Sequence, residues 1–199
     1  MNNTKDKRQM ILDIAARIFS RYGYSKTSLD EIAQEARIAK GTIYYYFTSK
    51  EELFSQIVQK QGRLFVEELR ENLQEMSGFE SKLGYFLQAP MTYVCEKMPH
   101  WVDGLKTIPF NLQKHFDTFK DENRKQMLAI LMEIIKEGIE EGLISEQIDL
   151  DKLSVVITDW FLVSDLSIEI VDFDNFLMRI KRDHDTILKI IMYGILKRG

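Results

Sequence analysis

Cysteine and proline are scarce in this sequence of 199 residues, and each shortage excludes a class of protein. The one cysteine, Cys95, cannot form a disulfide within the chain, so we expect no disulfide framework and a reducing compartment. Only three prolines occur, and apolar residues recur at spacings of three and four residues with little alternation. The sequence therefore predicts an all-α fold.

Long apolar runs are also missing. The segment from Trp160 to Val163 lies between Asp159 and Asp165, so it is far shorter than the roughly 18 apolar residues of a membrane span. The first eight residues are polar and of mixed charge, without the apolar core of a signal peptide behind them, so we expect no secretory signal. These observations predict a cytoplasmic protein.

The sequence has no pattern that indicates catalysis. His100, His115 and His184 do not have the H-x-x-x-H or H-E-x-x-H spacing of metal ligands, and no C-x-x-C, G-x-S-x-G or phosphate-binding loop is present. We therefore expect that the protein is not an enzyme and that it has no metal site and no cofactor.

Charge is distributed unevenly along the chain. Residues 1–60 contain 10 Lys and Arg against 7 Asp and Glu, whereas the whole chain has 27 against 31. A basic N-terminal part on an acidic remainder indicates that only the N-terminal part meets a polyanion such as DNA.

Two helices are predicted in the first 36 residues. The first ends at Gly23 and buries one apolar face, made of Ile11, Ile14, Ala15, Ile18, Phe19 and Tyr22. The second begins at Ser28, whose hydroxyl lies three residues before Glu31, the spacing of a capping box. It is short, and its apolar residues are Leu29, Ile32, Ala33 and Ala36.

A third short helix, from about Lys40 to Phe47, follows a three-residue turn and completes a helix-turn-helix. At 100° per residue, Ile43 and Phe47 share the face that packs on the protein, whereas Tyr44 and Tyr45 point away from it. A phenol offers an apolar ring to thymine methyls and a hydroxyl to phosphates or base edges. This helix is therefore predicted to read DNA.

Residues at the helix starts are candidates for phosphate contacts. Lys40 begins the third helix and Lys50 begins the fourth, which Ser49 caps. Thr27 and Ser28 open the second helix and offer hydroxyl and N–H groups. Gly41 would let the backbone approach the duplex closely.

The segments T-S-L-D-E-I-A-Q-E-A (27–36) and A-K-G-T-I-Y-Y-Y-F-T-S-K-E-E-L (39–53) resemble the DNA-binding domain of the TetR family of bacterial transcriptional regulators. The resemblance covers about residues 8–55. It implies a homodimer with ligand-binding helices behind the DNA-binding domain. It also implies DNA contacts at a set of positions comprising Thr27, Ser28, Lys40, Gly41, Thr42, Tyr44, Tyr45, Tyr46 and Lys50.

Three positions depart from the family pattern. Arg37 stands where glycine is usual, so it should adopt a left-handed conformation at a cost of roughly 1 kcal/mol, and it could add a phosphate contact. Ala39 replaces a frequent serine cap, so the cap of the third helix must come from elsewhere. Tyr46 replaces a frequent histidine. Each departure could alter operator preference.

The remaining chain is predicted to form a larger helical domain. The fourth helix continues towards Gly78, the region after Phe79 is expected to be irregular around Pro90, Pro99 and Pro109, and three long helices follow at about 117–141, 150–171 and 175–197. We place the domains at 1–49, for DNA binding, and 50–199, for ligand binding and dimerisation. Partners are then double-stranded DNA, a second copy and an apolar or amphipathic small molecule.

Aromatic residues around the three prolines suggest an apolar ligand pocket. Its candidate residues are Phe86, Tyr93, Met98, Trp101, Phe110, His115, Phe119, Trp160 and Asp165. The last two helices carry more apolar surface than outer helices need, which favours a dimer interface. A helical protein-interaction module that does not bind DNA is the alternative function.

Overall fold

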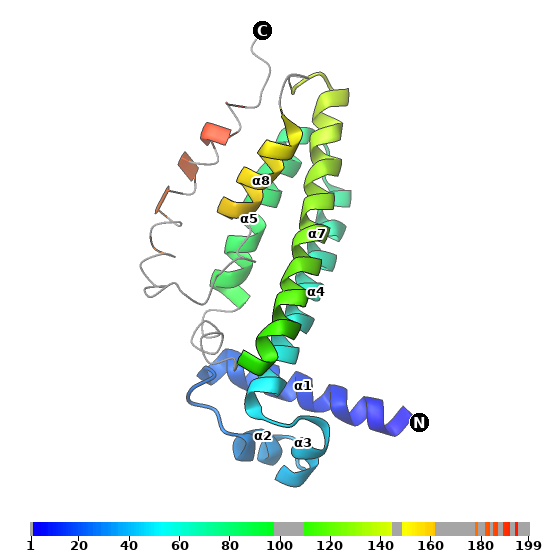
Figure 1. Ribbon diagram of the computed structural model, residues 1–199, viewed down its shortest axis with the longest axis vertical. Helices are drawn as coiled ribbons and strands as arrows, with labels where there is room; N and C mark the ends of the chain where they lie inside the picture. The colour runs from blue at the N-terminus through cyan, green and yellow to red at the C-terminus, as the bar shows by residue number, and fades with distance from the viewer. Residues whose placement is uncertain are drawn as a thin grey trace. The chain divides into compact units, whose positions relative to one another are not determined.

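The computed structural model describes residues 2–97, 110–144 and 149–161, together with single positions and short runs between 178 and 194. Its helices are α1 (Asn2–Tyr22), α2 (Leu29–Glu35), α3 (Lys40–Tyr46), α4 (Lys50–Glu75), α5 (Phe79–Lys97), α7 (Phe110–Glu140) and α8 (Leu150–Phe161), drawn in Figure 1. Within the described residues there is no β-strand, so the all-α prediction is confirmed. None of the helices in this part of the chain has the length and apolar character to span a membrane.

The chain divides into two compact units. The head consists of residues 1–63 and 95–119, and the body consists of residues 64–94 and 120–199. The head therefore extends past the boundary expected at residue 49, because Leu53, Phe54 and Ile57 of α4 belong to the same buried cluster as α1, α2 and α3. The division into a DNA-binding domain at 1–49 and a ligand-binding domain at 50–199 stays a prediction about function.

The head is built on one apolar face of α1. Ile11, Ala15 and Phe19 are fully buried there, and Gly23 ends the helix with a φ of 83°, as its position after the periodic segment predicts. The expectation that Tyr22 is buried is wrong, since its side chain is 52% exposed. The reversal at Gly23 places Tyr24 in the core instead, where it is 5% exposed.

Four helices of the body, α4, α5, α7 and α8, contribute to a second buried cluster. Asn72 on α4 donates a hydrogen bond to the Tyr85 hydroxyl on α5 (2.7 Å), and Lys82 on α5 pairs with Glu137 on α7 (2.6 Å). The fully buried residues between these helices include Phe79 and Phe86. These contacts hold the second half of α4, α5 and α7 together around the buried cluster.

The expectation of an irregular chain after Phe79 is wrong for residues 79–97. α5 continues through Pro90, although proline has no N–H to donate to the carbonyl of Phe86. The residues before it form one buried face of the helix, with Leu83, Phe86 and Leu87 at 1% exposure or less. Burial of this face stabilises the helix by more than the one lost hydrogen bond costs.

The later helices agree with the sequence in part, α7 at its end and α8 at its start. α7 ends one residue before the expected Glu141, and Gly142 follows with a φ of 72°. Its start at Phe110 is seven residues earlier than expected. α8 begins at Leu150 as predicted, where Asp149 accepts a hydrogen bond from the N–H of Lys152, which lowers the pKa of that carboxyl. Residues 162–171 and most of the helix expected at 175–197 lie outside the described residues.

The close packing around Gly138 of α7 can be tested by a single substitution. A Cβ there would lie 2.6 Å from the ring of Phe79 and 2.8 Å from Ile144. We expect Gly138→Ala to lower the free energy of unfolding by at least about 1 kcal/mol, because the buried ring must move. Urea unfolding followed by circular dichroism measures this.

Gly84 of α5 provides the matched control. A Cβ at Gly84 would meet no heavy atom of the described residues within 4 Å. Gly84→Ala should therefore stabilise the protein by about 0.5 to 1 kcal/mol, the ordinary gain of alanine over glycine in a helix. Equal effects of the two substitutions would contradict the packing at Gly138.

Candidate nucleic-acid interface

The second helix begins with the capping box that the sequence predicts. The hydroxyl of Ser28 accepts a hydrogen bond from the N–H of Glu31 (3.2 Å), and the Glu31 carboxylate accepts one from the N–H of Ser28 (2.6 Å). The second of these bonds and a further one from the Ser28 hydroxyl lower the pKa of Glu31. α2 therefore has a fixed start, and it packs against both α1 and α3.

The turn between α2 and α3 contains the strained residue that the sequence predicts. Arg37 has a φ of 52°, the left-handed conformation that usually requires glycine. Among the non-glycine residues that the structure describes, it alone has a positive φ. Its side chain is exposed, so the guanidinium lies at the surface of the turn.

The two sides of α3 differ sharply in exposure. Ile43 and the following Phe47 are buried in the head core at 0% and 1%, whereas Tyr44 is 50% exposed and Tyr45 is 77% exposed. Tyr46 is half-buried, and its ring meets that of Tyr45 edge to face at 4.9 Å between centroids. The helix thus fixes its inner side on the protein and presents two phenol rings to solvent.

The start of α3 is open. Ala39 occupies the cap position and makes no side-chain hydrogen bond, as its lack of a polar group predicts, and the N–H of Thr42 donates to the Ala39 carbonyl (2.8 Å). A Cβ on Gly41 would meet no heavy atom of the described residues within 4 Å. Nothing in this part of the protein therefore requires glycine at position 41.

Lys40 connects the two helices of the motif. Its ammonium lies 2.7 Å from a carboxylate oxygen of Asp30 on α2, and this hydrogen bond raises the pKa of Lys40. The side chain is 45% exposed. Because exposed pairs of this kind are weak, a phosphate can compete with Asp30 for the lysine.

Lys50 lies against Tyr24, a residue whose contribution the sequence reading missed. The Lys50 ammonium is 4.0 Å from the centroid of the Tyr24 ring, and burial lowers the pKa of Lys50. The Tyr24 hydroxyl donates to Glu51 (2.8 Å). The sequence signal for Tyr24 was its position directly after Gly23. The chain reverses at this glycine, and the reversal brings the next side chain back onto the end of α1.

The family described as "Bacterial regulatory proteins, tetR family" matches residues 11–57, the segment that holds this motif. The fatty acid metabolism regulator protein of Bacillus subtilis is 28% identical over 150 residues, which cover 75% of this chain and 76% of that protein. The chain belongs to the TetR family. It is therefore a DNA-binding transcriptional regulator, of a class that acts as dimers and responds to small molecules.

One further relative matches over a shorter segment, and two solved structures have a similar fold at lower identity. The regulator AcrR of Shigella flexneri is 51% identical over 53 residues, which cover 27% of this chain and 25% of that protein. These relatives are regulators and not enzymes. The solved FadR structure from Bacillus subtilis, in complex with stearoyl-CoA, has a TM-score of 0.62 at 22% identity, covering 94% of this chain and 98% of that one. A regulator from Cytophaga hutchinsonii has a TM-score of 0.73 at 18% identity, covering 95% and 98%.

Thr27 differs from the expectation for a TetR family contact. Its side chain is only 3% exposed, its hydroxyl donates to the Gly23 carbonyl (2.8 Å), and its N–H donates to the Tyr24 carbonyl (3.2 Å). Neither donor is free for DNA in this arrangement. Thr27 instead closes the turn between α1 and α2, which places Ser28 at the start of α2.

The expected ligand pocket of this TetR family chain is only partly within the described residues. Phe86 is fully buried in the body core. Tyr93 is half-buried 4.8 Å from the ring of Phe65, and burial raises the pKa of Tyr93 to about 12. Phe119, in contrast, belongs to the head and packs on the head core. The structure therefore does not place Phe119 in one compact unit with Phe86 and Tyr93.

Six further pocket candidates cannot be compared with the expectation. Met98, Trp101 and Asp165 lie outside the described residues. Phe110, His115 and Trp160 lie within helices, but their side chains are outside what the structure describes. These six positions stay predictions from the sequence.

Proposed function

We propose that this regulator is a repressor that binds a near-palindromic operator as a homodimer through α3 and leaves it when an effector binds the body. The observation that carries the proposal is the contrast on α3. Tyr44 and Tyr45 are exposed on one side, while Ile43 and Phe47 fix the opposite side in the head. A helix anchored in this way holds its outer side chains in a defined orientation for the major groove.

The proposed roles divide between bases and phosphates. Tyr44 and Tyr45 read base edges or thymine methyls, because they are the most exposed side chains of α3 and carry both apolar and polar groups. The cationic side chains of Arg37, Lys40 and Lys50 bind phosphates. Further backbone contacts are proposed for Ser28, Gly41, Thr42 and Tyr46.

The proposed dimer uses the C-terminal helices. Ile190 is 66% exposed and Met178 is 62% exposed, whereas the neighbouring Ile191 packs against the body core. Exposed large apolar side chains beside one that packs on the core indicate a surface covered by a partner. A twofold dimer would place two copies of α3 on two half-sites, which is why the operator is proposed to be near-palindromic.

The proposed effector is an apolar or amphipathic molecule, and a long-chain fatty acyl-CoA is the class to test first. Support comes from the similarity to the fatty acid metabolism regulator and to the FadR structure with stearoyl-CoA. The apolar tail suits a site near Phe65 and Tyr93, which contact each other in the body. We place the protein in the cytoplasm, where the DNA and such thioesters occur.

Selection of bound duplexes from a random-sequence pool with the full-length chain tests this function. We expect a near-palindromic sequence to be enriched, and we expect stearoyl-CoA, but not free CoA, to release it in a fluorescence anisotropy titration. A chain that holds no duplex at low ionic strength would overturn the proposal in favour of a protein-interaction module. Release by neither compound would overturn the acyl-CoA assignment alone.

Gly41→Ala should change stability and DNA affinity in opposite directions. A Cβ at position 41 meets no described atom of the protein, so alanine should raise the free energy of unfolding by about 0.5 to 1 kcal/mol. The same Cβ would separate α3 from the duplex and weaken binding. Gly84→Ala, which should give a similar gain without a change in DNA affinity, is the control. An affinity that rises with stability would contradict the role of Gly41.

A further inference from the structure

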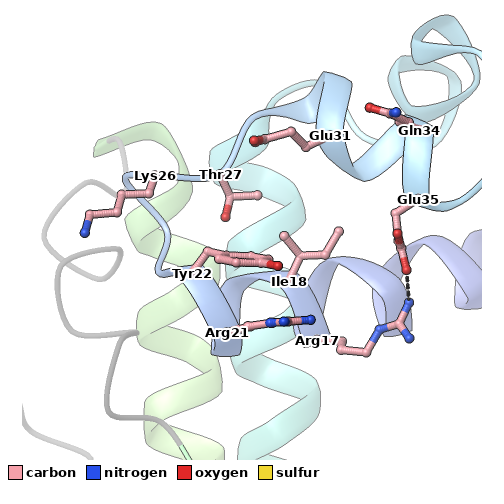
Figure 2. A pocket seen from close by; sticks show the side chains of 9 residues that line it. All are labelled: Arg17, Ile18, Arg21, Tyr22, Lys26, Thr27, Glu31, Gln34 and Glu35. Carbon is pink, nitrogen blue, oxygen red and sulfur yellow. Dashed lines mark hydrogen bonds and ion pairs between the residues drawn. The ribbon is translucent and has the colours of Figure 1, made fainter.

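A hollow of about 480 Å³ lies on the head between the last two turns of α1 and the helix α2, as Figure 2 shows. Its apolar lining consists of Ile18 and the ring of Tyr22. Three cationic side chains also line it, namely Arg17, Arg21 and Lys26. None of these cations belongs to the set of DNA contacts that the sequence predicts.

The charges around this hollow are only partly neutralised. Glu35 pairs with Arg17 at 2.7 Å, and Glu31 is held by the capping box at Ser28. No carboxylate among the described residues pairs with Arg21 or Lys26. Two cations are therefore available to an external anion on this side of the head.

Arg21 is held in place by an aromatic ring. Its guanidinium carbon lies 5.1 Å from the centroid of the Tyr22 ring, and Tyr22 itself is 52% exposed. A guanidinium that stacks on an aromatic face keeps the N–H groups at its edge free to bind phosphate oxygens. The stacking also restricts the side chain before binding, so less conformational entropy is lost when a phosphate arrives.

Lys26 connects the hollow to the proposed DNA interface. It directly precedes Thr27 and Ser28, which lead into the first helix of the helix-turn-helix. In such motifs the first helix crosses the DNA backbone while the second enters the groove. Cations at the start of the crossing helix thus lie on the side where the backbone passes.

We propose that Arg21 and Lys26 bind backbone phosphates beyond the bases that α3 reads, so that the hollow extends the DNA footprint of the head. The proposal rests on the proposed function, because it requires the same duplex. Charge complementarity and continuity with the helix-turn-helix favour DNA over a small anion, since the two cations, unpaired among the described residues, adjoin the proposed DNA surface. These contacts carry no sequence information and act equally on every duplex.

Salt-dependent binding of the full-length protein tests the two residues. The variants are Arg21→Gln, Lys26→Gln and the double variant, each measured by anisotropy on the selected duplex and on a random duplex. Because the proposed homodimer carries two copies of each cation, each single variant should reduce the magnitude of the slope of log K against log salt concentration by about two units, and the double variant by about four. One unit corresponds to about a tenfold loss of affinity at 0.1 M relative to 1 M salt.

Lys60→Gln is the charge-matched control. Lys60 also belongs to the head, but its ammonium pairs with Asp13 at 2.6 Å on another part of α1, so its removal should leave the slope unchanged. A duplex shortened to the bases that α3 reads should bind the wild type and the double variant equally. Slopes like that of Lys60→Gln, or a difference that persists on the short duplex, would overturn the proposal.

The failure of this inference is distinguishable from the failure of the proposed function. If the wild type binds no duplex, the proposed function fails and the footprint with it. If the wild type binds and the slopes of both single variants match the wild type, only the footprint proposal fails. A loss of affinity with an unchanged slope would assign Arg21 and Lys26 a structural role and would also overturn it.

Discussion

Tyr45→Ala should weaken binding to the selected operator by about 1 to 3 kcal/mol and should leave binding to random duplex DNA nearly unchanged. The side chain is 77% exposed on the outer side of α3, so its removal takes nothing from the head core. The loss should therefore appear in the ratio of the two affinities, measured by anisotropy on both duplexes, and not in the melting temperature.

Lys50→Ala is the matched contrast to the tyrosine variant. A lysine that binds phosphate contributes equally to every sequence, so this variant should weaken both duplexes alike and flatten the salt dependence. Tyr45→Phe distinguishes the contribution of the ring to DNA affinity from that of the hydroxyl, since phenylalanine keeps only the ring. Equal losses on operator and random DNA for Tyr45→Ala would contradict base reading by this residue.

Phe54→Ala should have the largest effect on the fold, with a loss of about 3 to 5 kcal/mol in the free energy of unfolding. The ring is fully buried and meets Phe19 edge to face at 5.5 Å and Tyr24 at 4.8 Å between centroids. Because whole domains are stable by only about 5 to 15 kcal/mol, this loss removes a large fraction of the stability of the head. Urea unfolding measures the loss, and DNA binding should fall with it.

Leu64→Ala is the control for Phe54→Ala, because it also shortens an apolar side chain of α4 but at an exposed position. Leu64 is 41% exposed, so its replacement should change the free energy of unfolding by about 0.5 kcal/mol or less. The ring of Tyr24 contacts both Phe54 and the Lys50 ammonium. Phe54→Ala should therefore displace Lys50 and weaken DNA binding even where the head stays folded. A melting curve like that of Leu64→Ala would exclude Phe54 as the centre of the head core.

The motif could be predicted from the sequence because its determinants are local. Ser28 and Glu31 cap α2 through bonds between residues three apart, and the left-handed Arg37 follows from its place at a turn position where the family pattern usually has glycine. The two faces of α3 follow from helical periodicity, so the burial of Ile43 and Phe47 required no knowledge of the rest of the chain.

Other features depend on contacts between distant residues and could not be read in this way. The α1 pattern assigns Tyr22 to the core, but the chain reverses at Gly23 and Tyr24 fills that position. The local rule for proline breaks α5 at Pro90, but burial of the residues around it keeps the helix continuous. The ionic partner of Lys40 likewise depends on the tertiary fold, which brings Asp30 of α2 near it.

The first turns of α4 are packed into the same buried core as α3. Leu53, Phe54 and Ile57 are fully buried in the same core as Ile43 of α3, so the first two turns of α4 move with the head as one solid piece. A rotation of these turns would therefore reorient Tyr44 and Tyr45 together with the head. Separation of the protein from DNA in this way would require no unfolding of the head.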